Sequence, residues 1–286
     1  MGTIREYQRK IISLRNTRKI TGSMKMISSI KLQRMTKLRT QALPFIAATE
    51  KCKVIVAAVA PEGRTQIVNG WKKPENVHVL LITGDRGLCG RFNSNTIRAM
   101  LQNSAKAQGR SVSFSSIGYK GHHFLKRKGF DIRHYWEKAA AHPSWESAKT
   151  IGSELFQSFE SETFHEVWMV YSKRTGSFTE EPVVSRLLPF ALIPEEQKID
   201  TDYILEDSAE RILIKAAELF VQSRVYEAIL DSAVAEHAAR MSAMDNASSN
   251  CDRLLGQYIQ LRNRARQAVI TTELNEIVTG KEALES

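Results

Sequence analysis

The sequence predicts a protein of the α/β class, in which a long antiparallel coiled coil of the N- and C-terminal helices carries a central Rossmann-like α/β domain. Two long stretches of helix-forming residues at the ends of the chain predict the coiled coil. Between them, short apolar runs alternate with helical stretches, as they do in a mostly parallel sheet covered by helices. We therefore expect a helix over residues 1–60, an α/β domain over residues 75–200 and a second helix over residues 206–286.

The N-terminal helix is predicted by composition and spacing. Between Thr3 and about residue 60 the chain has one proline, Pro44, and one glycine, Gly22, among mainly good helix formers. An interior proline disfavours a helix by about 3 kcal/mol, so we expect a bend or a lost hydrogen bond at Pro44. Apolar or small residues recur at steps of three and four in two blocks around a charged middle: Ile4, Tyr7, Ile11 and Leu14, then Leu38, Ala42, Phe45, Thr49, Cys52, Val56 and Val59.

The C-terminal helix is predicted by a long stretch without breakers. Residues 206–278 contain no proline and a single glycine, Gly256. Helices of about 55 and about 70 residues would be roughly 80 and 105 Å long, whereas a compact globule of this chain would be only about 50 Å across. The two ends are therefore expected to pair with each other. The seam of the second helix is predicted at Met241, Met244, Ser248, Cys251, Leu255, Tyr258, Arg262, Ala265 and Val269.

The predicted sheet occupies the middle of the chain. Apolar runs typical of strands span residues 76–82, 110–117, 130–136 and 165–173, with helix-like stretches near residues 93–107, 119–128 and 144–160. A last strand-like run over residues 181–190 leads back towards the C-terminal helix. The repeated order of strand, helix and strand indicates parallel strands with helices on both faces of the sheet.

The segment GDRGLCGRFN follows the first predicted strand, where a nucleotide-binding protein would place its phosphate loop. Its glycines, Gly84, Gly87 and Gly90, have a GxxGxxG spacing, which is neither the GxGxxG of a dinucleotide fold nor a Walker loop. No acidic residue that could bind a ribose stands between Phe92 and Phe130. We therefore expect no bound nucleotide, and we predict that the glycines allow a tight turn and close packing against a neighbour.

No catalytic, metal or cofactor site is predicted elsewhere. The histidines form no HExxH motif, and no GxSxG motif is present. Cys52, Cys89 and Cys251 are far apart, which favours free thiols in a reducing compartment. The longest apolar runs are far shorter than the roughly 18 residues of a membrane helix, and the N-terminus has no apolar signal region. These features predict a cytosolic chain that does not itself span a membrane.

Positive charge is concentrated at the start of the chain. Residues 1–53 hold thirteen Lys and Arg against two acids, whereas residues 54–286 hold 28 against 29. A strongly basic helix attracts acidic protein surfaces, and it could also neutralise nucleic-acid phosphates. A basic coiled-coil protein that binds nucleic acid is therefore an alternative interpretation. Against it, the helix has no recognisable binding motif and only two aromatic residues, Tyr7 and Phe45.

Three parts of the chain resemble the gamma subunit of F-type ATP synthases. They are LRNTRKITGSMKMISSIKLQRM over residues 14–35, GDRGLCGRFN over 84–93, and EHAARMSAMDNASSN with RNRARQAVITTELNEIVTG over 236–250 and 262–280. The resemblance covers both ends and the central loop, and the order and length of the chain agree with it. The combination of these segments is highly specific, although each alone would be a weaker signal.

The resemblance implies a rotating central-stalk subunit that is not itself catalytic. Its expected partners are the alpha and beta subunits of the catalytic hexamer, the epsilon subunit, and the ring of c subunits in the membrane. Ion flow through that ring would turn the stalk and drive synthesis or hydrolysis of ATP at the beta subunits. The chain would then lie at the cytoplasmic face of a bacterial inner membrane, held there through the complex.

The resemblance also carries over individual residues. Met24, Lys25 and Arg240 match positions near acidic lever loops of the beta subunits, and we expect Lys25 and Arg240 to lie on an exposed face. Residues matching a contact with a catch loop on beta are Arg266, Gln267, Thr271 and Glu273. The loop of the foot domain that would face neighbouring subunits comprises Gly87, Leu88, Cys89 and Gly90. The sequence departs from the family pattern at Cys251, Arg262 and Lys281, and an extra charge near the upper contacts could change their fit.

Overall fold

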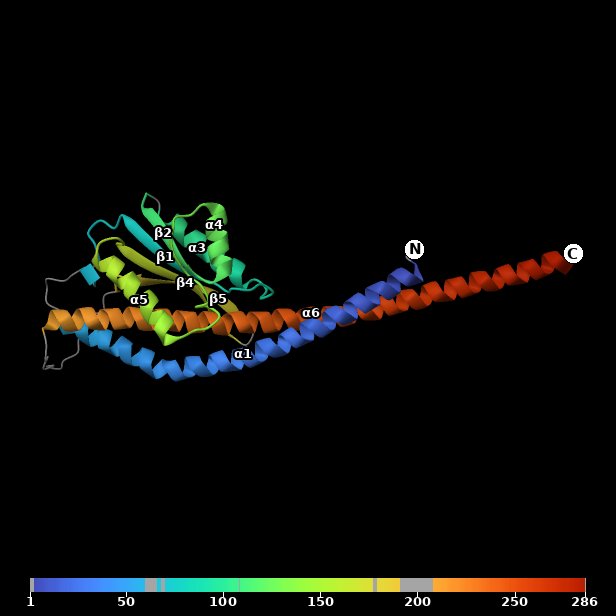
Figure 1. Cartoon of the computed structure of the whole chain (residues 1–286), viewed down its shortest axis with the longest axis horizontal. Helices are drawn as coiled ribbons and strands as arrows, with labels where there is room; N and C mark the ends of the chain where they lie inside the picture. The colour runs from blue at the N-terminus through green and yellow to red at the C-terminus, as the bar shows by residue number, and fades with distance from the viewer. Residues whose placement is uncertain are drawn as a thin grey trace. The chain divides into compact units, whose positions relative to one another are not determined.

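The computed structural model describes residues 3–59, 66–67, 70–107, 109–176, 179–190 and 208–285. Its contacts divide the chain into two compact units, one made of Met1–Ser28 with Met241–Ser286 and the other of Ser29–Arg240. Two long helices, α1 (Ile4–Val59) and α6 (Ala209–Glu285), contribute to both units (Figure 1). The predicted class, with two long terminal helices and a central α/β domain, is confirmed.

The α/β domain lies in the second unit and contains one five-stranded sheet. In chain order its elements are β1 (Asn76–Ile82), α3 (Phe92–Ala105), β2 (Ser111–Ile117), α4 (Tyr119–Lys128), β3 (Ile132–Trp136), α5 (Trp145–Glu160), β4 (Glu166–Arg174) and β5 (Glu180–Leu188). The strand order is β3-β2-β1-β4-β5, and only β5 runs antiparallel to its neighbour. The predicted mostly parallel sheet is therefore confirmed, with the last strand-like run as its antiparallel edge.

Helices cover both faces of the sheet, as its apolar pattern requires. Val79 and Leu81 of the central strand β1 point to a core shared with α3 and α4, whereas Leu80 and Ile82 point to a core shared with α5 and α6. A strand that is covered on both faces has a nearly continuous run of apolar residues in its sequence. β1 is such a strand, and it is buried from Val77 onward.

The first part of α6 belongs to this core. Phe220, Val221, Val225 and Ile229 are buried together with side chains of the sheet and of α5. A β-carbon at Gly152 of α5 would come 2.7 Å from the Cα of Gln222, so the two helices cross with almost no space between their backbones. The sequence predicts that the terminal helices bury their stripes against each other, and it does not predict this contact with the sheet. In the structure, α6 uses this part of its length to cover one face of the sheet.

In the unit formed by Met1–Ser28 and Met241–Ser286, α1 and α6 run antiparallel. Arg18 Nε lies 2.6 Å from Asp252 Oδ1, and Lys25 Nζ lies 2.7 Å from Asp245 Oδ1. A step of seven residues forward on α1 thus matches seven residues back on α6, which is the heptad repeat of a coiled coil. The predicted seam on α6 is buried or half-buried from Met241 to Ala265, but the prediction is wrong at Val269, which is exposed.

The predicted seam on α1 is correct in its first block and partly wrong in its second. Ile11 is buried, and the other members of the first block are half-buried. In the second block Ala42 and Thr49 are buried, but Phe45 is 40% exposed and Ile46 takes the buried position. Cys52 is also exposed, and the side chains of Val56 and Val59 lie outside the described residues. The helix continues through Pro44.

His78 on β1 is buried without charge. Its ring stacks on Phe164 at a centroid distance of 4.0 Å, and its Nδ1 lies 2.8 Å from Ser113 Oγ. Burial lowers the pKa of His78 to about 3, and the positive charges of Arg133 and His134 add to this effect.

We expect His78 to make the folded state acid-sensitive. Below pH 6.5, the ordinary pKa of histidine, His78 binds a proton in the unfolded chain, whereas in the folded chain it stays neutral until the pH nears 3. The free energy of unfolding therefore falls as the pH is lowered through this range. His78→Gln should flatten this dependence in urea titrations between pH 7 and about pH 4, since glutamine binds no proton. The His142→Gln variant, at an exposed histidine that does not contribute to the His78 shift, is the control and should retain the slope. Equal slopes for both variants and the unmodified chain would contradict the assignment.

Candidate functional site

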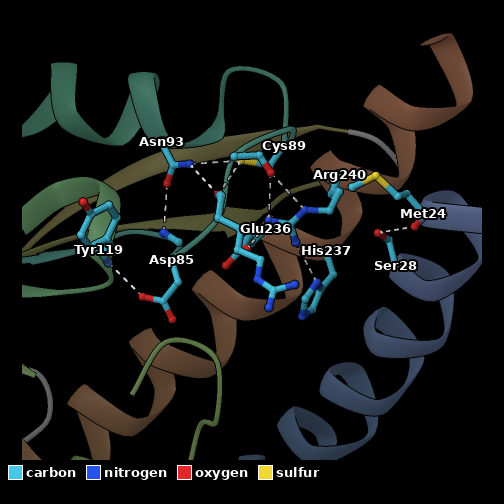
Figure 2. A network of polar contacts seen from close by, with 12 residues as sticks. Met24, Ser28, Asp85, Cys89, Asn93, Tyr119, Glu236, His237 and Arg240 are labelled. Carbon is cyan, nitrogen blue, oxygen red and sulfur yellow. Dashed lines mark hydrogen bonds and ion pairs between the residues drawn. The ribbon is translucent and has the colours of Figure 1, made fainter. Parts of the chain in front are cut away.

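The carboxyl ends of β1, β2 and β3 meet at one edge of the sheet, where open α/β sheets usually place their functional residues. The segment after β1 is the glycine loop, residues 83–91, and the segment after β2 begins α4 at Tyr119. Figure 2 shows that side chains of α6, Glu236, His237 and Arg240, lie against this loop. All of these residues belong to the unit Ser29–Arg240.

The loop is held in a tight turn by the start of α3. Gly84 N donates to Asn93 Oδ1 at 2.9 Å, and Asn93 Nδ2 donates to the carbonyl of Arg86 at 3.4 Å (Figure 2). Leu88 and Gly90 have positive φ angles of 62° and 59°, a region that favours glycine. The Asn93 side chain therefore holds two points of the loop together. The tight turn that we predicted from the glycines is confirmed at Gly90.

The loop packs closely against α6. Cys89 and Phe92 form a buried apolar cluster with Ala235 and Ala239 of the helix. A β-carbon at Gly84 would lie 2.8 Å from the carboxyl carbon of Glu236. The predicted close packing against a neighbour is thus confirmed at Gly84, and the neighbour is a helix of the same chain. At Gly87, by contrast, a β-carbon would meet only Lys120 Cε, at 3.9 Å.

Arg240 links the helix to the loop. Its guanidinium donates to Glu236 Oε1, and it also lies 3.4 Å from the carbonyl oxygen of Gly87 through both Nε and a terminal nitrogen (Figure 2). Arg240 is 8% exposed, as is Glu236. Burial raises the pKa of the Glu236 carboxyl, although the charge of Arg240 opposes that rise. Our expectation that Arg240 lies on an exposed face is therefore wrong, because the loop covers this side of α6.

His237 and Cys89 are the titratable groups beside this ion pair. Burial lowers the pKa of His237 to about 4, and the nearby Arg240 and Lys31 contribute. The neutral ring then can accept a hydrogen bond at Nδ1, which lies 3.2 Å from Arg240. Burial raises the pKa of the Cys89 thiol. A protonated thiol is a poor nucleophile, so this pair of groups is suited to packing rather than to covalent chemistry.

A cavity of about 430 Å³ adjoins the loop and α6. Its lining carries both signs of charge, with the cations Lys31, Arg86, Lys138 and Arg240 and the carboxylates Asp85, Glu137 and Glu236. Asp85 Oδ1 already accepts a hydrogen bond of 2.9 Å from Tyr119 N, and Glu236 is paired with Arg240. Among the described residues, no group of three potential metal ligands is found. The arrangement therefore holds a loop on a helix, and it leaves the side chains of Arg86 and Lys138 exposed.

The remaining contact residues that the resemblance suggested lie in the other unit. Met24 is half-buried, and Lys25 is paired with Asp245, both side chains being about half exposed. The predicted catch-loop residues are all exposed on the last turns of α6: Arg266, Gln267, Thr271 and Glu273. Of the departures from the family pattern, Cys251 is buried, whereas Arg262 donates to Gln8 Oε1 at 3.2 Å.

Sequence reasoning missed Asn93 and Glu236. A signal for Glu236 was available, because a Glu and an Arg four residues apart on a helix face each other, as Glu236 and Arg240 do. No comparable signal identified Asn93, whose role depends on the path of the loop.

Known proteins similar to this chain were found both by sequence and by structure. The profile of the ATP synthase family matches residues 3–284. The ATP synthase gamma chain of Pelotomaculum thermopropionicum is 34% identical over 289 residues, covering 100% of both chains. That of Moorella thermoacetica is 35% identical over 285 residues, covering 99% of this chain and 100% of the relative.

Solved structures share the fold at lower identity. A chain of the Euglena gracilis mitochondrial ATP synthase, from a structure of OSCP, F1 and c-ring, aligns with a TM-score of 0.66 at 17% identity, covering 98% of this chain and 94% of that one. A chain of the central stalk and c-ring of the Tetrahymena thermophila enzyme aligns with a TM-score of 0.60 at 22% identity, covering 80% and 99%. Both the family profile and the bacterial relatives span nearly the whole sequence, and the chain therefore belongs to the family of ATP synthase gamma chains.

Proposed function

We propose that this gamma chain couples ion movement through a membrane ring of c subunits to ATP synthesis or hydrolysis at beta subunits, without being catalytic itself. Its partners would be the alpha, beta and epsilon subunits and the c ring. It would act at the cytoplasmic face of a bacterial inner membrane, held there by the complex. Support comes from the bacterial gamma chains that it resembles and from assemblies with a c-ring in which similar folds occur. Within the described residues, no helix has an apolar stretch long enough to cross a bilayer.

The observation that carries this proposal is the exposed C-terminal part of α6. Residues 266–281 are exposed throughout. Ile270, Leu274 and Ile277 share one face of the helix and are 52%, 58% and 72% exposed. An apolar stripe of this kind at i, i+4 and i+7 is typical of a helix that binds in a groove of a partner. We therefore assign this end, with Arg266, Gln267, Thr271 and Glu273, to contact with the beta subunits.

A second exposed surface supports contacts along α1. Ile12, Ile20 and Ile27 are each at least half exposed and lie on the same side of the helix, among basic residues. Apolar side chains ringed by cations suit a partner surface that carries both apolar and acidic groups. We assign Met24 and Lys25 to the same type of contact, with acidic loops of the beta subunits. The loop of Gly87, Leu88, Cys89 and Gly90 offers Leu88, which is exposed, to a neighbouring subunit.

The proposal is tested by co-expressing the tagged chain with the alpha and beta subunits of its own organism. We expect a stoichiometric complex that hydrolyses ATP, and no ATPase activity from the chain alone. A folded chain that is recovered without either subunit would overturn the proposal. The same chain would then be titrated with duplex DNA at low and moderate salt, because steeply salt-dependent binding is the mark of phosphate neutralisation by the basic helix.

Shortening the chain after Thr271 is expected to weaken assembly before it affects catalysis. The deletion removes Leu274 and Ile277 from the exposed stripe, and no catalytic group is assigned to this segment. Recovery of the alpha and beta subunits at increasing salt should fall, while ATP hydrolysis per recovered complex changes little.

A pair of point variants gives the matched control. Ile277→Asp places a charge on the apolar stripe, and Thr272→Asp places the same charge on the opposite side of the exposed helix end. We expect only the first to reduce recovery of the complex, with unchanged melting temperature of the free chain. Equal recovery for both variants would remove the assignment of the stripe as a contact.

A further inference from the structure

Asp231 is the buried acidic residue of α6 that faces both α1 and the sheet. It is 2% exposed. Its Oδ1 accepts a hydrogen bond from Arg39 Nε of α1, and its Oδ2 lies 3.8 Å from Lys173 Nζ of β4. One carboxylate thus joins three elements of the unit Ser29–Arg240 through two cations.

We call Asp231, Arg39 and Lys173 the junction, and the charges around it interact strongly with one another. Tyr171 lies two residues before Lys173 and so on the same face of β4. Burial raises the pKa of Tyr171 to about 12, and the nearby charges act in both directions, since Asp231 and Glu227 raise it while Arg224 and Arg39 lower it. Attraction between charges is stronger in such a buried place than in water, and a charge left without its partner is strongly unfavourable there.

The other contacts of these elements are mainly apolar. Between α1 and α6 they include Met35 against Ala233 and Val234, and between α6 and the sheet they belong to the large apolar core. Apolar contacts resist separation but are non-directional, so they oppose sliding or rotation only through the fit of the side chains. The Arg39–Asp231 ion pair is hydrogen-bonded, so it depends on distance and angle and opposes such displacement directly. The Lys173–Asp231 pair, at 3.8 Å, has no hydrogen bond and opposes separation through charge attraction alone.

We propose that Asp231 is the positioning residue that makes α1, α6 and the sheet move as one rigid body under a twisting load. This inference rests on the proposed function, in which the α/β domain is turned from the membrane side and the helices must follow. Arg39 carries the load between the two helices, and Lys173 carries it between α6 and β4. No catalytic role is assigned to either residue, so we expect the junction to act on the coupling of the complex and not on its chemistry.

Three variants separate the junction from general packing. Asp231→Asn keeps the shape and removes the charge, and Lys173→Met removes the cation on the sheet side. Lys173 is 41% exposed along its side chain, so this variant is expected to fold even if Asp231→Asn does not. The control is Thr49→Val, which removes a buried hydrogen bond of 2.8 Å between α1 and Ser223 of α6 without touching the sheet.

The measurement is the torsional stiffness of single rotors in the assembled complex, together with ions pumped per ATP hydrolysed. We expect Asp231→Asn and Lys173→Met to lower the stiffness and to reduce pumping at unchanged ATP hydrolysis. Thr49→Val should lower the stiffness less than either junction variant, because it removes one neutral hydrogen bond between the helices and leaves both ion pairs of Asp231 in place. The inference is overturned if Lys173→Met behaves like the unmodified chain, or if Thr49→Val lowers the stiffness as much as the junction variants.

Hydrogen exchange on the free full-length chain tests the junction independently of assembly. Amides of α1 near Arg39 and of β4 near Lys173 should exchange faster in Asp231→Asn and Lys173→Met than in Thr49→Val. If the unmodified chain fails to assemble with alpha and beta subunits, the proposed function fails, and this exchange pattern still decides whether the junction holds the three elements together. Unchanged exchange at both places in Lys173→Met would refute it.

Discussion

Replacing Arg240 by glutamate is expected to destabilise the folded chain by about 3–5 kcal/mol, whereas the same charge reversal at Lys25 is expected to change its stability by about 1 kcal/mol or less. Family resemblance placed both residues in one class of exposed contacts, but their surroundings differ. Arg240 is buried and pairs with the buried Glu236, so the new carboxylate would face an existing one without solvent to screen the repulsion. Lys25 and Asp245 are both about half exposed, and water screens their interaction.

Urea titrations of the free chain measure this difference in the free energy of unfolding. Adding Glu236→Gln to the Arg240→Glu variant should recover part of the loss, because it removes the repulsion between two buried carboxylates. In the assembled complex, Lys25→Glu should reduce ATP-driven pumping while the chain remains folded, as the proposed contact with an acidic loop requires. Equal stability of the Arg240→Glu and Lys25→Glu variants would show that the Glu236 pair does not hold the loop on α6.

The sequence predicted the elements of this fold well because their signals are local. The spacing of three and four residues identified both long helices, and the alternation of apolar runs with helical stretches identified the sheet. The seam was harder to place. Where two apolar residues are adjacent, as at Phe45 and Ile46, spacing alone does not decide which is buried. Thr21 and Ser28 of α1 are also buried, but the apolar pattern does not identify them because both are polar.

The candidate site was only partly predictable, because its chemistry depends on contacts between distant segments. The glycine loop could be located and the common nucleotide motifs excluded from its spacing alone. That α6 is the neighbour of the loop could not be deduced, since nothing in the loop sequence specifies which surface covers it. The exposure of Arg240 was misjudged for the same reason. A charged residue on a predicted helix is assumed to face water until a second element is found against it.

Gly84→Ala is expected to destabilise the folded chain by about 1–3 kcal/mol, because the added methyl group must displace a side chain that has little room to move. The new β-carbon would lie 2.8 to 3.0 Å from the carboxyl atoms of Glu236. A flexible side chain can often yield to such a contact. Glu236, however, is buried and held by Arg240 of the same helix, so moving it would strain this ion pair and, through Arg240, the contact with the carbonyl of Gly87 in the loop.

Gly87→Ala is the matched control from the same motif. Its β-carbon would meet only the flexible end of Lys120, at an ordinary contact distance of 3.9 Å, and we expect a change within about 0.5 kcal/mol. Thermal and urea unfolding of both variants compares them directly. If both glycines tolerate alanine equally, close packing on α6 does not explain the first glycine.

A double-mutant cycle identifies the cause of the Gly84 effect. In a Glu236→Ala background the carboxylate that obstructs the new methyl group is absent, so Gly84→Ala should cost much less than it does in the unmodified chain. The cost of Glu236→Ala itself, which leaves Arg240 buried without its partner, cancels in the cycle. A full-sized Gly84→Ala effect in both backgrounds would point to backbone conformation instead of contact with α6. The predicted non-additivity would show that this glycine serves the attachment of a helix, at the place where other α/β proteins hold a phosphate.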